Sequence, residues 1–167
     1  MKNPTRSPRL PRWLLCPLLC LLLCLCSCGQ EAPLPDCTAD EAAQALLTAN
    51  QFSETLESVE TDIAVAVYGL EEDHVLDCAA YLSTGATAEE CTVVLLDSQE
   101  AAETAVEALQ RRVEDQTAVL ENYLPQELQK LSDARTGTIA VKGGVMAYLV
   151  VAETVESVEP VWNDFVK

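Results

Sequence analysis

The chain has 167 residues, a formal net charge of −17 at pH 7, 49% hydrophobic residues and only 5% aromatic ones. Four of its ten basic residues lie within the first twelve positions, whereas all 27 acidic residues follow residue 27, which leaves a formal charge of −21 from Cys28 onward. That charge excludes an electrostatic nucleic-acid binder and argues against unaided binding to anionic lipid headgroups. The remaining length suffices for one domain with one hydrophobic core.

The amino terminus has the order of a secretory signal. Its basic residues are followed by an apolar run of fourteen residues from Trp13 to Cys26. A transmembrane helix needs about twenty apolar residues, so this run is typical of a signal peptide instead. We predict that residues 1–27 form a signal peptide that is absent from the mature protein.

The end of the apolar run reads Leu25-Cys26-Ser27-Cys28-Gly29 and resembles the lipobox of bacterial lipoproteins. The resemblance implies that Cys28 is the first mature residue and carries diacylglycerol and fatty acyl chains such as palmitate. Residues 28–36 contain two prolines and predict an extended tether. Acyl chains contribute about 0.8 kcal/mol per buried methylene, enough together to hold an acidic domain on the extracytoplasmic face of the cell membrane. The alternative is ordinary secretion with a cysteine-rich apolar run.

The mature chain begins with a helix signal. Thr38-Ala39-Asp40-Glu41 has the spacing of a capping box, and apolar residues then recur with helical spacing as far as Val59. Residues 62–70 fit both a strand and one helical face. Asp62 as an N-cap and Gly69 as a stop favour a short helix there.

Two β-hairpins are predicted. The first pairs residues 78–83 with 91–97, and the second pairs 138–141 with 145–152 around Gly143-Gly144, a sequence suited to a two-residue turn. The register expected across the second turn sets Val141 opposite Met146 and Ile139 opposite Tyr148.

Helices are predicted after each hairpin. A long amphipathic helix starts at Asp97 or Ser98 and ends near Tyr123-Leu124-Pro125, where the tyrosine ring is expected to pack. A short helix follows over 126–132, and a last amphipathic helix covers 158–165. Residues 37–167 are therefore expected to form a single α+β domain, ββα-ββα with an antiparallel sheet and packed helices, preceded by an N-terminal helix.

Three cysteines remain in the mature chain after Cys28, namely Cys37, Cys78 and Cys91. If the first hairpin is symmetric about Thr84-Gly85, Cys78 faces Cys91 closely enough for a disulfide, which export permits. An odd loop would instead place them on opposite faces of the sheet. The favoured alternative is two reduced, buried thiols with a structural role.

No cluster predicts a metal or cofactor site. The chain has one histidine, His74, and no cysteine pair with zinc-site spacing. Glu71-Glu72-Asp73-His74, with Asp77 close behind, lacks the spacing of a calcium loop and is typical of an exposed turn. Arg111-Arg112, the one basic doublet of the mature chain, fits a neutralised helix face better than an anion site. No residue is assigned a catalytic role.

Several segments beyond residue 60 carry a resemblance, namely Val67-Tyr68-Gly69-Leu70, Ala88-Glu89-Glu90, Leu109-Gln110-Arg111-Arg112, Gln116, Tyr123-Leu124-Pro125 and Gly143-Gly144. Together they resemble a family of lipoproteins from Gram-positive, clostridia-like bacteria that carries a domain of unknown function. The resemblance implies location and fold and supplies no chemistry. In that family the Tyr-Gly segment looks helical, which supports the helix over 62–69.

The function expected from these features is a membrane-tethered binding or scaffolding module of the cell envelope, which contacts an envelope protein or peptide and no nucleic acid. A small envelope hydrolase with an unrecognised active site is the alternative. The single histidine and the lack of a nucleophile motif favour the binding module over an enzyme. A transporter's solute receptor is a third interpretation, although 140 residues are few for two lobes.

Overall fold

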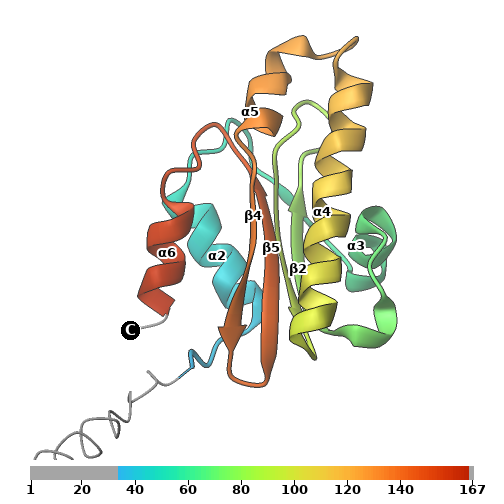
Figure 1. Cartoon of the computed structure of the whole chain (residues 1–167). Helices are drawn as coiled ribbons and strands as arrows, with labels where there is room; N and C mark the ends of the chain where they lie inside the picture. The colour runs from blue at the N-terminus through green and yellow to red at the C-terminus, as the bar shows by residue number, and fades with distance from the viewer. Residues whose placement is uncertain (1–33, 166–167) are drawn as a thin grey trace, which may run out of the picture. The chain divides into compact units, whose positions relative to one another are not determined.

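The computed structural model describes residues 34–165. The predicted signal peptide at 1–27, the lipidation site Cys28 and the tether before residue 34 lie outside the described residues. Within them the chain forms one α+β domain with a five-stranded antiparallel sheet and helices packed on it (Figure 1). The predicted fold class is confirmed, including the helix that precedes the first strand.

The elements follow the predicted ββα-ββα order. The sequence patterns did not indicate the strand Glu57–Val59 or the 3₁₀ turn Glu72–His74. The sheet has the strand order β1-β2-β3-β5-β4, and every neighbouring pair is antiparallel. In chain order the elements are α2 (Ala39–Ala49), β1 (Glu57–Val59), α3 (Thr61–Tyr68), the 3₁₀ turn η2 (Glu72–His74), β2 (Val75–Leu82), β3 (Glu90–Leu96), α4 (Gln99–Leu120), the 3₁₀ turn η3 (Pro125–Glu127), α5 (Leu128–Ser132), β4 (Arg135–Val141), β5 (Gly144–Val151) and α6 (Val158–Phe165).

Helices cover both faces of the sheet. In Figure 1, α2 and α6 lie on one side of the strands and α4 and α3 on the other. Strand β5 is buried along almost its whole length because its side chains alternate between the two cores. The core under α2 and α6 includes Leu46, Val93, Met146, Val150 and Trp162. The core under α4 and α3 includes Tyr68, Val94, Leu109, Leu149 and Val151.

Helix α2 begins as predicted and ends earlier. The capping box is present, with the Glu41 N–H donating to Thr38 Oγ1 at 3.1 Å. The helix stops at Asn50, whose side-chain nitrogen donates to the Leu46 carbonyl oxygen at 2.9 Å. The expected helical stretch as far as Val59 is wrong beyond this point, because Val59 belongs to β1 and pairs with β2.

The ambiguous segment after β1 is helical. Helix α3 ends at Gly69, whose φ of 64° is the left-handed conformation that glycine adopts without steric cost. The predicted short helix is therefore confirmed. Its N-cap is Glu60 instead of Asp62, which lies in the first turn and accepts from the Ile63 N–H at 2.9 Å.

The register of the first hairpin places Cys78 and Cys91 on opposite faces of the sheet. Cys78 pairs with Val94 and Cys91 with Tyr81, because the loop from Ser83 to Glu89 has an odd number of residues. Cys78 packs in the core under α4 and Cys91 in the core under α2, and both are free thiols. The symmetric register, one of the two alternatives, is therefore not formed and the odd-loop alternative is confirmed. A disulfide between Cys78 and Cys91 would have to cross the sheet.

The second hairpin forms with a register two residues from the expected one. Lys142 and Gly143 form the turn, with Gly143 at φ 96°. Gly144 opens β5 where a Cβ would collide with the Leu96 carbonyl oxygen, so glycine permits the close approach of β5 to β3. A shift of two keeps the same side chains on the buried face. The observed pairs are Val141 with Gly144, Ile139 with Met146 and Gly137 with Tyr148.

Helix α4 is capped by Ser98, which accepts from the Ala101 N–H at 3.3 Å. Its buried side is rich in alanine, which lets the helix lie close to the sheet. Tyr123, just beyond its end, is 79% exposed, so the expected packing of that ring is wrong. Within residues 34–165 no helix combines the length and apolar character needed to cross a membrane.

Candidate functional site

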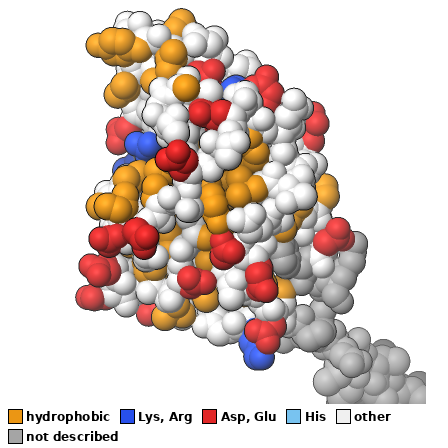
Figure 2. Space-filling model, turned by 180° about the vertical axis from the view of Figure 1, so that it is seen from behind, with side chains coloured by type: hydrophobic (Ala, Val, Ile, Leu, Met, Phe, Trp, Pro, Cys, Tyr) orange, Lys and Arg blue, Asp and Glu red, His pale blue; other side chains and the backbone are white. Residues whose placement is uncertain are grey.

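A groove of about 620 Å³ lies beside α2 on the surface that α2, the segment after it and β2 form together. We call it the α2 groove. Figure 2 shows the molecule from behind, with hydrophobic side chains gathered in the middle of that face and acidic side chains spread around them. The groove is lined by Gln44, Leu47, Asn50, Gln51, Phe52, Glu54, Thr55, Leu56 and Tyr81.

Hydrogen-bond acceptors line this groove. The Tyr81 hydroxyl donates to Asp40 Oδ1 at 2.5 Å and accepts from Gln44 Nε2 at 2.8 Å. Asn50 is only 8% exposed, and its Oδ1 is buried with no partner among the described residues. An unpaired buried acceptor destabilises a structure by about 1–3 kcal/mol.

Glu54 fixes one wall of the groove. Its carboxylate accepts hydrogen bonds from Ser83 Oγ at 2.5 Å, Thr87 Oγ1 at 2.6 Å and Thr84 Oγ1 at 3.4 Å. These hydroxyls, led by Ser83, lower the pKa of Glu54 below its ordinary value. The side chain therefore remains ionised at neutral pH and ties the β2–β3 loop to the groove.

A buried ion network stands behind the same wall. Lys130 Nζ lies 2.9 Å from Glu89, 3.0 Å from Glu153 and 3.2 Å from Glu127. The Lys130 side chain is 12% exposed and that of Glu89 is fully buried. Burial by itself would lower the pKa of Lys130, but the hydrogen bonds to the three carboxylates outweigh it and raise that pKa. Lys130 is thus a fixed ammonium and no nucleophile.

This network holds the segment that lines the groove. The Ser53 N–H donates to both oxygens of Glu89, at 3.0 and 2.9 Å, and Lys130 Nζ donates to Ser53 Oγ at 3.1 Å. Ser53 lies between Phe52 and Glu54, which are both groove residues. The lining is therefore fixed before any ligand arrives, which reduces the entropy lost on binding.

A second buried carboxylate lies on the opposite face of the sheet. Glu90 is 1% exposed, and its Oε2 lies 3.5 Å from Arg112 Nε and 3.4 Å from the Tyr68 hydroxyl. That hydroxyl also lies 2.5 Å from Thr92 Oγ1. Oε1 of Glu90 has no partner among the described residues. Burial outweighs the attraction of Arg112 and raises the pKa of Glu90 to about 6.

Residues from three of the quoted family-like segments meet at this carboxylate. Tyr68 comes from α3, Glu90 from β3 and Arg112 from α4. Gln116, one turn further along α4, accepts from Arg112 Nε at 3.1 Å when its amide oxygen faces the guanidinium. We call these four side chains the Glu90 cluster. The segments thus share a role in packing α3 and α4 on the sheet, and they do not line the α2 groove.

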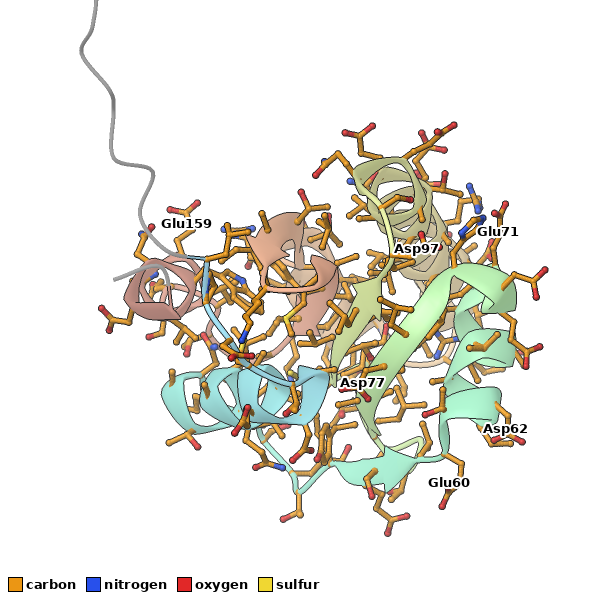
Figure 3. All side chains as sticks on the ribbon, turned by 90° about the horizontal axis from the view of Figure 1, so that it is seen from below. Glu60, Asp62, Glu71, Asp77, Asp97 and Glu159 are labelled. Carbon is orange, nitrogen blue, oxygen red and sulfur yellow. The ribbon has the colours of Figure 1, made fainter. Side chains whose placement is uncertain are left out.

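The acidic turn around the single histidine lies at the other end of the sheet. His74 Nδ1 is 2.9 Å from Asp97 Oδ2 and its Nε2 is 3.9 Å from Glu71. The hydrogen bond to Asp97 raises the pKa of His74 and lowers that of Asp97. Figure 3 shows the Glu71 and Asp97 side chains beside the start of α4. The turn is exposed, as its run of acidic residues predicted.

Asp77 is separate from that turn. It accepts from the Ala39 N–H at 3.0 Å and so caps α2 (Figure 3). Within residues 34–165 no three His, Cys, Asp or Glu side chains are placed to hold a metal ion. The two arginines of the basic doublet Arg111-Arg112 have different surroundings: Arg112 contacts Glu90, whereas Arg111 is exposed on α4.

Sequence reasoning missed both the α2 groove and Lys130. The available signal was Glu89-Glu90 at the start of an otherwise apolar strand, because buried carboxylates need donors. With only six basic residues from Cys28 onward, the candidate partners were few. No sequence pattern indicated the groove, because its lining residues come from α2, the segment after it and β2, which only the fold brings together.

Comparison with known families matches residues 49–151 to a domain of unknown function, DUF4358. The matched region runs from the end of α2 through β5 and contains most of the groove lining and the Glu90 cluster. Comparisons with curated proteins and with solved structures find no match for the chain.

Proposed function

The chain belongs to the DUF4358 family, and from that premise we propose that it is a lipid-anchored binding module of the bacterial cell envelope. The observation that carries the binding role is the α2 groove, whose lining is held in place by Glu54 and by the Lys130 network. A preformed hollow with a few fixed polar groups is the usual form of a binding site.

The chemistry of the groove favours binding over reaction. Its lining contains no histidine, cysteine or serine, and its charged side chain, Glu54, is engaged by three hydroxyls. The single histidine lies elsewhere, paired with Asp97. Acid–base and nucleophilic catalysis can also use glutamate or tyrosine. In this groove, however, the Tyr81 hydroxyl is bonded to Asp40 and Gln44, just as the Glu54 carboxylate is bonded to its three hydroxyls.

The anchor follows from the charge and from the order of the amino terminus. A domain with a formal charge of −21 is repelled by anionic lipids, so it needs a hydrophobic attachment to stay at a membrane. Cys28 at the lipobox-like sequence would supply it. The domain starts close by, because the Pro35 carbonyl accepts from the Lys142 N–H at 2.7 Å and Asp36 lies 2.6 Å from Lys142 Nζ.

Cysteine variants test the anchor. The full chain is expressed in a Gram-positive host with a clickable palmitate analogue, as wild type, Cys28→Ala and the matched control Cys37→Ala. Wild type and Cys37→Ala should be labelled and membrane-bound, whereas Cys28→Ala should lose the label and be released or remain unprocessed. A mature amino terminus at another residue, with a free α-amine and no acyl mass, would rule the anchor out.

A further inference from the structure

The α2 groove has a one-sided charge. Glu54 lies in its lining and Asp40 is bonded to the lining residue Tyr81, whereas no lysine or arginine is among the lining residues. The charge of Lys130 acts on Glu54 from behind the wall, but three carboxylates, those of Glu89, Glu127 and Glu153, offset it. Glu54 stays ionised because its bonded hydroxyls lower its pKa. The mature chain around it has 27 acidic residues against six basic ones. A ligand for this groove should therefore be cationic.

The groove also has apolar surface. Leu47, Phe52 and Leu56 are partly buried side chains that pack at the edge of the core beneath α2, and Tyr81 adds an aromatic ring. Such a lining can accept apolar side chains and the methylene stems of lysine or arginine, and its rings attract a cationic head. A small inorganic cation would leave this surface unused.

We propose that the α2 groove binds a cationic peptide segment of an envelope protein, with lysine or arginine side chains beside Glu54 and Asp40 and apolar side chains on Phe52 and Leu56. This inference rests on the proposed binding function and adds the chemical class of the ligand. Charge complementarity and the partly buried apolar lining both point to that class.

The test uses the mature, anchored protein in detergent and an acetylated heptapeptide of alternating lysine and leucine with a fluorescent label. The matched probe is the same peptide with every lysine acetylated. Thr55→Lys places a positive charge in the groove, since Thr55 is exposed and its side chain makes no hydrogen bond with the described residues. Ala118→Lys, on the exposed side of α4, makes the same change in net charge elsewhere.

The lysine peptide should bind wild type and Ala118→Lys within about two-fold of each other, and Thr55→Lys about ten-fold more weakly. Equal binding of the acetylated peptide would overturn the inference, because the lysine charge would then contribute nothing to binding. Equal weakening by the two lysine variants would also overturn it and would leave only nonspecific charge attraction. A further experiment distinguishes failure of the ligand class from failure of the binding function: a photoreactive amino acid replaces Thr55 and the protein is illuminated on membranes. If the lysine peptide does not bind but this residue still forms a specific adduct, the ligand class is wrong and the binding function stands.

Discussion

Glu89 and Glu90 are neighbours in the chain and each is 1% exposed, yet their carboxylates differ in the number and closeness of their hydrogen-bond partners. Glu89 receives two contacts from the Ser53 N–H and one from Lys130. Glu90 has Arg112 at 3.5 Å and the Tyr68 hydroxyl at 3.4 Å on one oxygen, while its other oxygen has no partner among the described residues.

The difference shows that the number and distance of hydrogen-bond donors, more than the degree of burial, decide how well a buried carboxylate is stabilised. Short bonds to an ammonium and a backbone N–H hold Glu89 as part of a fixed network. The long, one-sided contacts of Glu90 leave desolvation dominant, so its pKa rises to about 6. The first carboxylate helps to fix the α2 groove, and the second is expected to make the stability of the domain depend on pH.

Removing the cation of the first network should have the largest effect on stability. Lys130→Met would leave Glu89 and Glu127 buried without their ammonium, and breaking a buried pair in this way destabilises by about 3–5 kcal/mol. Denaturant unfolding of the mature protein at pH 7 measures the loss. The control Lys142→Met removes an exposed pair with Asp36 and should change stability by less than about 1 kcal/mol. Equal losses of unfolding free energy in the two variants would show that the buried Lys130 network stabilises the protein no more than the exposed Lys142–Asp36 pair does.

The second carboxylate should reveal itself through pH. The folded-state pKa of Glu90 is raised from 4.5 to about 6, so the native state binds its proton more tightly than the unfolded state and stability falls as pH rises from 4.5 through 6. Glu90→Gln lacks this loss. Its free energy of unfolding relative to wild type should rise by about 2 kcal/mol between pH 4.5 and pH 7.5.

Unfolding curves of both proteins across that pH range measure this change, with the exposed Glu114→Gln as control. A difference between Glu90→Gln and wild type that stays constant with pH would mean that Glu90 titrates normally in the folded protein.

A smaller effect is expected from the tyrosine that joins α3 to the Glu90 cluster. Tyr68→Phe removes the hydroxyl that contacts Thr92 and Glu90, which should destabilise by about 1 kcal/mol in denaturant unfolding at pH 7. Tyr123→Phe is the control, because that ring is 79% exposed. If Tyr68→Phe matches the control, the hydroxyl contacts do not hold α3 on the sheet.

Local patterns predicted the elements well. The capping box at Thr38, the stop at Gly69 and the Ser98 cap are decided by a few neighbouring residues, and each stands in the structure. The short strand β1 was missed because its three residues become a strand only by pairing with β2.

Contacts between segments far apart in the sequence determine the end of α2, the register of the first hairpin and the α2 groove, so local sequence patterns could not predict them. Helix α2 ends where Gln51 bridges to Thr154, about a hundred residues away in sequence. The odd β2–β3 loop is held by hydroxyls bonded to Glu54, which lies before β2. No spacing rule reports such partners, so the register of the first hairpin and the α2 groove emerged only from the fold.

The most direct test of the central claim, that the α2 groove is the binding surface of an anchored protein, is photo-crosslinking on intact membranes. A benzophenone amino acid replaces Thr55 in the groove or Ala118 on α4, and adducts are compared after illumination. A specific adduct at Thr55 and none at Ala118 is the predicted result. Equal adducts at the two positions, or none at Thr55 in protein that is membrane-bound, would contradict the claim.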